Sequence, residues 1–443
     1  MSDLLAAMRY HGRMENERKT LAIVGGGAAG LAAAIAAARE LHARRRAGEA
    51  DAVPVDVVVY ESDERVGRSV LATGNGRCNF SNARIAANLY HNGEFVSHAL
   101  LELLRRHEES RGGASACSLE MHPVGEFFAD LGLVWREDGG GRLYPFANKA
   151  SSVLDVLRSA GGRLGIREAC DSTVTNITLP THEGERFHLR LVGGAVEHAQ
   201  AVIVACGGHA RGEVLPAAYA PGPGRPVLGP LRTVEAVVKR LDSIRVRSSL
   251  ALIGPDGREK AKEEGELLFR SYGVSGIAVF NLSRFAREGD ALLVDFLPFE
   301  HEGERFLLAR HARMAADGLS FSCEDFLRGL LLPQVARAVI EQAGLRPSSS
   351  FGREDVSPLA AALKSFRLTV AGIGDPRQCQ VTRGGYEVAL FDPRTMESRR
   401  DPGLYAVGEA LDVDGPCGGY NLHWAWTSGI LAGCAAAERL AHA

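Results

Sequence analysis

The chain has 443 residues, 46% of them hydrophobic, with a formal net charge of −3 at pH 7 and eight cysteines. This length predicts two or three domains with a large core, and the nearly balanced charge gives no general attraction to nucleic acid or anionic membranes. No apolar run reaches the roughly 18 residues of a membrane span and the N-terminus shows no signal-peptide pattern, so we expect a cytoplasmic protein without membrane association.

The first expected elements are a strand at residues 21–24 and an alanine-rich helix, joined by a Gly-x-Gly-x-x-Gly turn at Gly25, Gly27 and Gly30. This order is typical of a dinucleotide-binding fold. The turn lets the backbone approach a pyrophosphate, and the helix N-terminus presents free N–H groups and the positive end of its dipole.

A second apolar strand is expected at residues 55–60, ending in Glu61. This carboxylate can accept hydrogen bonds from both ribose hydroxyls and repels a 2′-phosphate. The acid lies further from the turn than the usual spacing of roughly 20 residues, because a polar, arginine-rich insertion occupies residues 42–50. At this point the pattern fits either FAD or NAD.

Residues 67–82, GRSVLATGNGRCNFSN, form a loop rich in backbone donors, suited to wrapping phosphate and the edge of an isoalloxazine. Arg68 and Arg77 can meet a pyrophosphate. Cys78 has no histidine partner in the sequence, so we interpret it as a small packed thiol rather than a nucleophile or a flavin tether.

The pattern of the remaining sequence predicts different kinds of element along the chain. Helices are expected at 95–106 and 151–159, a hairpin at 173–179 and 187–192, and a strand at 201–206. After prolines 221, 223, 226 and 230, short alternating runs at 243–253, 266–270, 277–282 and 292–297 predict a small antiparallel sheet or barrel. Residues 302–345 are expected to be helical, and a strand returns at 367–371.

Residues 404–415, LYAVGEALDVDG, are the second part of the predicted cofactor site. A strand ends in Gly408-Glu409, and the Gly418-Gly419 turn opens a helix. In FAD-bound Rossmann domains such a strand end holds the ribityl and phosphate region, and the helix N-terminus faces N1 and O2 of the flavin. That positive end stabilises charge on a reduced flavin, so this return favours FAD over NAD.

The fold class is therefore α/β, with a Rossmann-type FAD-binding domain made from both chain ends and with a β-barrel-like domain and a helical subdomain inserted. The predicted boundaries are 19–215 and 377–443 for the two parts of the FAD-binding domain, 216–300 and 351–376 for the β-rich domain, and 301–350 for the helical insert. Asp412 and Asp414 lack a histidine that would complete a metal site, and no C-x-x-C pair occurs, so we expect no metal.

The chain resembles a bacterial family of FAD-dependent oxidoreductases labelled aminoacetone-oxidase-like, whose members include a bile-acid-pathway flavoprotein. The matching motifs run in order at 23–30, 67–82, 141–157, 202–208, 269–284, 379–386 and 403–433. The resemblance implies the three-part architecture and reduction of a carbon–carbon double bond in a steroid ring or in a ribosomal-RNA uracil. The chain departs from the family at Ser69, Tyr386 and His423 and after Gly208, so the substrate does not transfer with the fold.

The residues expected to act fall into two groups. Tyr272 and Ser275 of the YGVSG turn face the flavin by resemblance, and Tyr420 and His423 open the final helix, where a histidine could deliver a proton. We predict catalysis by Tyr272, His423 and Tyr420. The cofactor-binding residues are predicted to be Gly25, Gly27, Ala28, Ala29, Gly30, Glu61, Arg68, Thr73, Gly74, Asn75, Gly76, Arg77, Cys78, Asn79, Val174, Ala205, Gly207, Gly408, Glu409, Asp412, Gly418, Gly419, Tyr420 and Asn421.

The leading hypothesis is an FAD-dependent reductase of an activated C=C bond in a small or steroid-like substrate. Only one Gly-x-Gly-x-x-Gly follows a convincing strand, so NAD(P)H is expected to bind transiently at the flavin face as electron donor. A uridine reductase acting on ribosomal RNA is less favoured by the overall charge. A flavin amine oxidase and a non-catalytic flavin module remain alternatives, and the sequence does not specify the oligomeric state.

Overall fold

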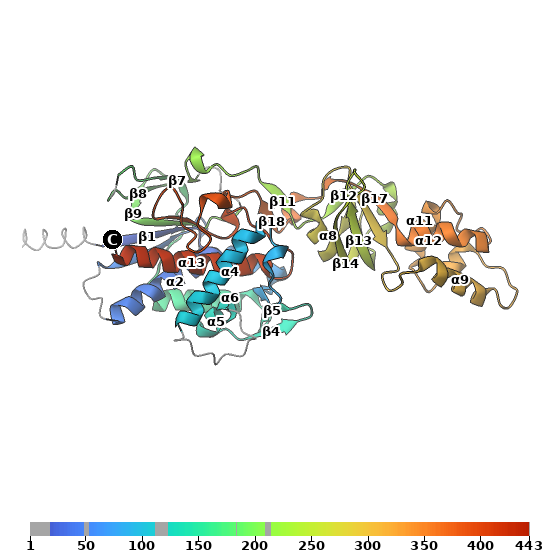
Figure 1. Cartoon of the computed structure of the whole chain (residues 1–443), viewed down its shortest axis with the longest axis horizontal. Coiled ribbons are helices and arrows are strands. Elements are labelled where there is room, and N and C mark those ends of the chain that lie inside the picture. The colour runs from blue at the N-terminus through green and yellow to red at the C-terminus, as the bar shows by residue number, and fades with distance from the viewer. Residues whose placement is uncertain (1–17, 48–52, 111–122, 183, 209–213, 443) are drawn as a thin grey trace, which may run out of the picture. The chain divides into compact units, whose positions relative to one another are not determined.

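The computed structural model describes residues 18–47, 53–110, 123–182, 184–208 and 214–442. The chain divides into two compact units, one made of residues up to 225 together with those from 382 onward, the other of Pro226–Val381. Figure 1 shows the blue segment from β1 onward and the red helix α13 within the first unit. The two passages between the units run through β11 (Arg225–Val227) and β18 (Val381–Arg383), which pair as a two-stranded sheet.

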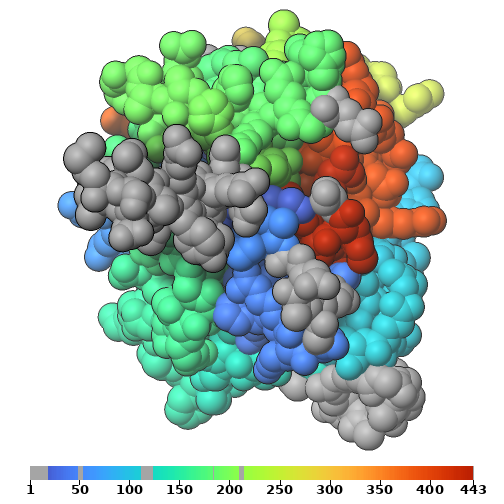
Figure 2. Space-filling view, turned by 90° about the vertical axis from the view of Figure 1, so that its left-hand side faces the viewer, coloured from blue at the N-terminus to red at the C-terminus, as the bar shows by residue number. Residues whose placement is uncertain are grey.

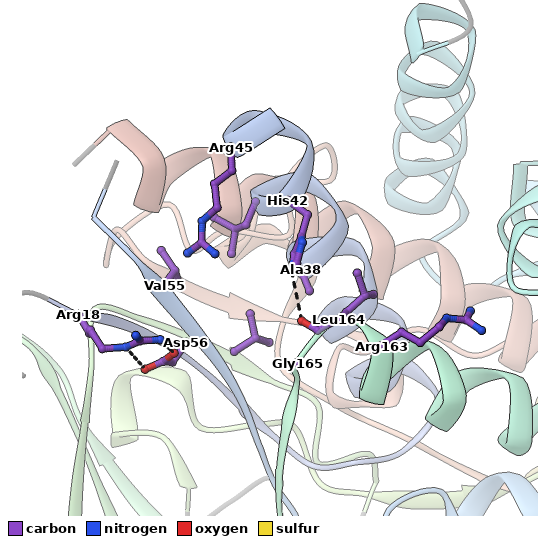
Figure 3. Close-up of a pocket in the computed structure, with 11 residues that line it drawn as sticks. Arg18, Ala38, His42, Arg45, Val55, Asp56, Arg163, Leu164 and Gly165 are labelled. Carbon is purple, nitrogen blue, oxygen red and sulfur yellow. Dashed lines mark hydrogen bonds and ion pairs between the residues drawn. The ribbon is translucent and has the colours of Figure 1, made fainter. Parts of the chain in front are cut away.

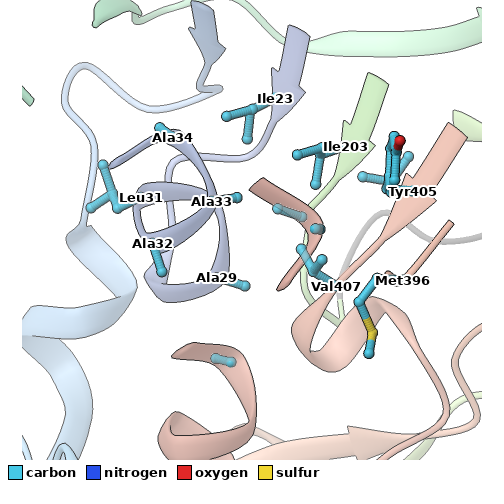
Figure 4. Close-up of a cluster of buried hydrophobic side chains, with 14 of the residues drawn as sticks. Ile23, Ala29, Leu31, Ala32, Ala33, Ala34, Ile203, Met396, Tyr405 and Val407 are labelled. Carbon is cyan, nitrogen blue, oxygen red and sulfur yellow. The ribbon is translucent and has the colours of Figure 1, made fainter. Parts of the chain in front are cut away.

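The first unit contains a five-stranded parallel sheet in the order β19–β10–β1–β2–β6. Its strands are β1 (Lys19–Val24), β2 (Val55–Tyr60), β6 (Arg167–Ala169), β10 (Ala201–Val204) and β19 (Leu404–Ala406). All four residues of β10 are fully buried, as expected for a parallel strand covered on both faces. Figure 4 shows Ile23 and Ile203 of neighbouring strands in the core beside Ala33 and Val407.

The helices of this unit are α2 (Ala28–Arg46), α3 (Arg68–Ala72), α4 (Gly93–Ser110), α5 (Pro123–Asp130), α6 (Ala150–Arg163) and α13 (Tyr420–His442). Helix α13 packs along α2 at very short range, because Gly429 lies against the backbone of Ala29 and Gly433 against that of Ala33. The space-filling view shows red carboxy-terminal residues bordering blue amino-terminal ones (Figure 2). This packing joins the two ends of the sequence into one domain.

Two small antiparallel sheets complete the first unit. One has the order β3 (Ser81–Asn82), β5 (Arg142–Pro145) and β4 (Trp135–Asp138). The other contains β7 (Val174–Thr178), β8 (Phe187–Leu191) and β9 (Val196–Ala199), which confirms the predicted hairpin.

The second unit is a closed barrel with a helical subdomain. The barrel order is β12–β15–β14–β13–β16–β17. Its elements are β12 (Leu231–Thr233), β13 (Arg245–Ile253), β14 (Glu259–Arg270), β15 (Gly273–Ser275), β16 (Ala291–Asp295), β17 (Phe366–Ile373) and α8 (Ile277–Ser283), and the subdomain contains α9 (Gly303–Met314), α10 (Cys323–Leu327), α11 (Pro333–Gln342) and α12 (Val356–Lys364). The predicted fold class, a Rossmann-type domain with a barrel-like and a helical insert, is confirmed.

One predicted element is wrong. Residues 277–282 were expected to form a strand and are helical in α8. The buried positions are Ala278, Val279 and Leu282, while Ile277 is 55% exposed. This spacing of one and four residues follows a helix face rather than strand alternation, and the preceding residue Gly276 has a left-handed backbone that ends β15.

Candidate functional site

The predicted phosphate turn lies between β1 and α2. The N–H of Gly25 donates to the carbonyl of Tyr60 at 2.8 Å, which ties the turn to the end of β2. A Cβ on Gly30 would overlap the carbonyl oxygen of Gly25, whereas a Cβ on Gly27 would meet only Ser69 Oγ, at 3.2 Å. Gly30 is therefore required by packing, and Gly27 leaves room for a ligand.

The start of α2 offers its amides to that room. The N-cap is Gly27, and no side chain caps the helix. The N–H groups of a first turn have no acceptors within the helix, so Ala28 and Ala29 can donate to an anion there. The first turn contains no acidic residue. This donor set and the space at Gly27 fit the pyrophosphate of a dinucleotide.

Glu61 is held in the position that the sequence predicts for the ribose ligand. Its Oε2 accepts from the N–H of Gly26 at 2.8 Å, and its Oε1 accepts from Ser62 Oγ and from the N–H of Asp63, each at 2.9 Å. A carboxylate has about four lone-pair sites, so these bonds fix the side chain and leave acceptor capacity. The geometry fits a hydroxyl-bearing ribose.

Helix α3 begins beside the same turn. Its N-cap is Gly67, whose N–H donates to the carbonyl of Gly26 at 2.8 Å. Arg68, a predicted pyrophosphate ligand, instead pairs with Asp63 at 2.7 Å and is 55% exposed. Its role at the cofactor remains a prediction, and Ser69 is the α3 side chain that lies nearest to Gly27.

The loop after α3 has a left-handed backbone at Gly74, Asn75, Gly76 and Cys78. It starts at Thr73, whose Oγ1 donates to the carbonyl of Val70 at 2.7 Å. The Cys78 side chain is fully buried, and burial raises the pKa of its thiol to about 11. A protonated thiol without solvent access supports the interpretation as a packing residue.

Two further side chains of this loop define its other side. The guanidinium of Arg77 lies over the Tyr144 ring, 5.0 Å from its centroid. The Oδ1 atom of Asn79 is buried and has no hydrogen-bond partner among the described residues. An orphaned buried acceptor at this position fits a ligand that supplies a donor.

The carboxy-terminal half of the site meets the amino-terminal half at Gly408. Its N–H donates to Ser428 Oγ at 2.9 Å, and its carbonyl accepts from Trp424 Nε1 at 3.0 Å, which fixes it to α13. A Cβ on Gly408 would lie 2.9 Å from the Cβ of Ala29 in the first turn of α2. The structure thus brings together residues that are about 380 positions apart in the sequence.

Glu409 and Asp412, two predicted cofactor ligands, hold the chain that returns from the second unit. Glu409 Oε1 accepts from the N–H of Thr382 at 2.7 Å, and Asp412 Oδ1 accepts from the N–H of Gly384 at 2.8 Å. Burial opposes ionisation of Asp412, but hydrogen bonds from His91 and Gly384 outweigh it and lower its pKa. Any contact of these two carboxylates with the cofactor remains a prediction.

The start of α13 is enclosed by the β3–β5 sheet. Tyr420 donates from its hydroxyl to the carbonyl of Arg84 at 2.8 Å, and burial raises the pKa of this phenol. Asn421 Oδ1 accepts from the N–H of Gly415 at 2.8 Å. His423 is fully buried, with Nδ1 hydrogen-bonded to Ser81 Oγ at 2.8 Å. Direct proton delivery by His423 thus remains a prediction, and the geometry favours a positioning role.

The other predicted residues occupy several places. Ala205 donates its N–H to the carbonyl of Val24 at 2.8 Å, so it lies at the phosphate turn. Gly207 follows it with a left-handed backbone, and Val174 is buried at the start of β7. Trp424 and Trp426 are buried in the core of the first unit.

Residues 19–435 match the family model described as the HI0933-like protein Rossmann domain. The chain belongs to this family. It is 34% identical to a 3-dehydro-bile acid delta(4,6)-reductase of Clostridium scindens, with 95% of this chain and 99% of the relative covered. It is 26% identical to ribosomal RNA dihydrouridine synthases of Haemophilus influenzae, covering 92% and 95% of the two chains, and of Escherichia coli, covering 93% and 96%.

The family and these relatives identify the chain as an FAD-dependent oxidoreductase. Not all predicted site residues of this HI0933-like protein lie in its Rossmann-type unit. Tyr272 and Ser275 belong to the second unit, where Tyr272 lies in the turn between β14 and β15 and Ser275 ends β15. Their participation therefore stays a prediction.

A separate pocket of about 300 Å³ lies near the amino ends of the parallel strands, away from the carboxyl ends where the phosphate turn lies (Figure 3). It is formed by the start of β2, the end of α2 and the loop after α6, and its lining includes His42, Arg45 and Arg163. Arg18 pairs with Asp56 there, and His42 Nε2 lies 3.3 Å from the carbonyl of Leu164. Ligands of parallel sheets bind at the carboxyl ends of the strands, so this pocket is distinct from the FAD cradle.

Neither a metal nor a membrane feature emerges from the described ranges. Within them, no group of three or more His, Cys, Asp or Glu side chains could hold a metal ion. No helix among the same residues has the length and apolar character required to cross a membrane.

Proposed function

We propose that the protein reduces an electron-poor carbon–carbon double bond in a small, steroid-like substrate. The observation that carries this proposal is the two-part cradle, in which Gly408, hydrogen-bonded to Ser428 of α13, lies against Ala29 in the first turn of α2. The similarity over 95% of the chain to a reductase of 3-dehydro-bile acids supports the substrate class.

The chain contributes binding and orientation to this reaction. Bound FAD, once reduced, supplies the two electrons and the hydride equivalent that an activated double bond accepts. The amides of α2 and the carboxylate of Glu61 bind the adenosine diphosphate part, and the N-terminus of α13 places positive potential where negative charge develops. The Tyr420 hydroxyl donates its hydrogen bond to the carbonyl of Arg84 at 2.8 Å, so it holds the start of α13 against the segment that follows β3.

We propose that His423, hydrogen-bonded to Ser81, positions the start of α13, and that Tyr272 donates a hydrogen bond to a substrate carbonyl. His423→Gln and Tyr272→Phe separate the roles. Tyr272→Phe is expected to reduce its FAD at the normal rate but to reduce the substrate much more slowly. If His423→Gln loses the acidic or the basic limb of the profile of reduction rate against pH, the histidine itself transfers the proton.

The electron donor is proposed to be NAD(P)H, bound transiently at the flavin. Anaerobic stopped-flow mixing with NADH and with NADPH should bleach the visible flavin band with one of them. Absence of bleaching with either nucleotide contradicts this step. The substrate class is tested in a separate experiment. Steroids with a 3-oxo-4-ene or a 3-oxo-4,6-diene group are incubated with chemically reduced protein, and mass spectrometry should show products that have gained two hydrogens.

The ribosomal RNA relatives make uridine reduction the second candidate. The exposed face of β13 and β14 gives this candidate little support, because Arg245 pairs with Glu266 at 3.5 Å and Arg247 pairs with Glu264 at 3.4 Å, each diagonally across the two strands. These pairs leave no excess positive charge for a phosphate backbone. Dihydrouridine missing from ribosomal RNA of a gene-deletion strain, with no activity on steroids, would favour RNA. Peroxide release with aminoketones would instead indicate an amine oxidase.

A further inference from the structure

Two buried polar atoms that find no hydrogen-bond partner among the described residues lie beside the glycine turn that precedes α13. They are the acceptor Oδ1 of Asn79 and the donor Nε of Arg142. A Cβ on Gly419 would lie 3.0 Å from Asn79 Oδ1, and a Cβ on Gly418 would lie 3.9 Å from Arg142 Cγ. An acceptor and a donor therefore flank consecutive residues of one turn.

The backbone fixes both side chains at this turn. Arg142 lies opposite Asn82 in the antiparallel pairing of β5 with β3. The Asn82 amide donates to the carbonyl of Gly418 at 2.8 Å, which binds the small sheet to the turn. Asn79 immediately precedes the same sheet, where the N–H of Phe80 donates to the carbonyl of Leu143 at 3.0 Å.

Burial without a partner is unfavourable for an amide oxygen and more so for part of a charged guanidinium. Two other partly buried arginines of the first unit have carboxylate partners: Arg383 pairs with Asp414 at 2.6 Å, and Arg106 pairs with Glu438 at 2.7 Å. In the described parts of the chain, no carboxylate forms an ion pair with Arg142. An unpaired cation next to an orphaned acceptor indicates that a ligand with complementary groups completes the site.

We propose that Asn79 and Arg142 bind the pyrimidine edge of the flavin and that Arg142 raises the reduction potential of the bound FAD. This edge carries a C2 carbonyl acceptor, an N3–H donor and a C4 carbonyl acceptor. Asn79 Oδ1 matches the N3–H, and Arg142 Nε matches a carbonyl oxygen. Two-electron reduction adds negative charge near N1 and O2, so a guanidinium beside the α13 N-terminus stabilises the reduced form more than the oxidised form.

The test measures the reduction potential of FAD-loaded Arg142→Gln by anaerobic equilibration with a reference dye. The expected result is a preference for reduced over oxidised FAD at least tenfold weaker than in the wild type, which lowers the potential by about 30 mV for a two-electron couple. Arg158→Gln is the matched control, because Arg158 of α6 carries the same charge, is half exposed and pairs with Glu168 of β6 away from the glycine turn. This control should keep the wild-type potential.

Asn79→Ala gives an independent measurement. The N3–H is present in both redox states, so this variant should weaken binding of oxidised FAD by about tenfold and move the potential much less than Arg142→Gln. A merely structural role of either side chain would lower the unfolding midpoint of the apoprotein without changing the potential or the FAD affinity at a temperature where the protein is folded.

Wild-type potential in folded, FAD-loaded Arg142→Gln overturns the proposal for Arg142, and unchanged FAD affinity in Asn79→Ala overturns it for Asn79. If Arg142→Gln does not fold, Arg142→Lys provides the test. Lysine keeps the charge but loses the fixed Nε donor. Weaker FAD binding with a nearly preserved potential is then expected, and wild-type values for both properties refute the proposal.

Discussion

Two glycines of the same motif should respond oppositely to alanine, because one faces backbone and the other faces the ligand space. Gly27 has φ −78° and ψ −165°, a conformation open to any L-residue, and its Cβ would meet only a serine hydroxyl at 3.2 Å. A Gly→Ala change in a compatible conformation stabilises a protein by about 0.4–1 kcal/mol. We therefore expect Gly27→Ala to leave the apoprotein equally stable or up to about 1 kcal/mol more stable.

Gly30→Ala should destabilise the apoprotein severely. Its Cβ would overlap the Gly25 carbonyl and lie 3.3 Å from the Cβ of Ala205. Neither neighbour can move away by rotating a side chain, so α2 must separate from the turn, at a cost of about 3–5 kcal/mol.

The effect of Gly27→Ala on FAD binding should be large, in contrast to its small effect on stability. The Cβ of Gly27→Ala occupies the space where the pyrophosphate approaches, and we expect at least about a 100-fold loss of FAD affinity, or about 2.7 kcal/mol. FAD titration followed by quenching of flavin fluorescence measures this loss.

Urea unfolding of the apoproteins measures the stabilities, and tryptophan fluorescence reports on the relevant unit because Trp135, Trp424 and Trp426 all lie in it. The reasoning is refuted if Gly27→Ala is destabilised as strongly as Gly30→Ala. It is also refuted if Gly27→Ala binds FAD with wild-type affinity.

Three further predictions concern side chains around the cradle. Asp414 is 1% exposed and paired with Arg383, so Arg383→Leu should lower the free energy of unfolding by about 3–5 kcal/mol because the buried carboxylate loses its guanidinium partner, and urea unfolding measures this change. The pKa of Asp412 is lowered in the folded protein. Its ionised carboxylate therefore stabilises the fold above the unfolded-state pKa of about 3.9, and this stabilisation is lost as the pH falls below that value. Asp412→Asn should therefore lose less stability than the wild type between about pH 5 and 3, as measured by acid titration. The Cys78 thiol, with its pKa raised to about 11, should resist a thiol reagent at pH 8 until urea unfolds the protein, and rapid labelling of native Cys78, located by peptide mapping, would contradict its burial.

The sequence predicts the cradle where its chemistry is local. The glycine spacing at 25–30, the acid at Glu61 and the strand ending at Gly408 each specify a backbone shape within a few residues, and the structure brings all three elements into one unit. The 277–282 segment shows the limit of such patterns, because a short apolar run fits a strand or a helix face equally well until Gly276 and the packing partners are known.

Long-range pairing accounts for what the sequence does not predict. Arg142 reaches the flavin end of the site only because β5 pairs with β3, and no local pattern distinguishes it from the chain's other arginines. An acid after a strand suggests a cofactor ligand, yet Glu409 and Asp412 accept from Thr382 and Gly384, whose proximity depends on the return from the second unit. His423 is similar, since its burial against Ser81 follows from the same small sheet.

The close packing of α13 on α2 sets the order in which the protein can be completed during synthesis. About 370 residues separate the end of α2 from the start of α13. At about 5–20 residues per second, the surface of α2 around Ala29 and Ala33 waits on the order of half a minute for its covering helix to leave the ribosome. The barrel, which lies wholly within Pro226–Val381, can assemble in that interval. The last barrel strand, β17, is synthesised about 50 residues before α13, so the insert is complete in the nascent chain while the nucleotide-binding half still lacks its final helix.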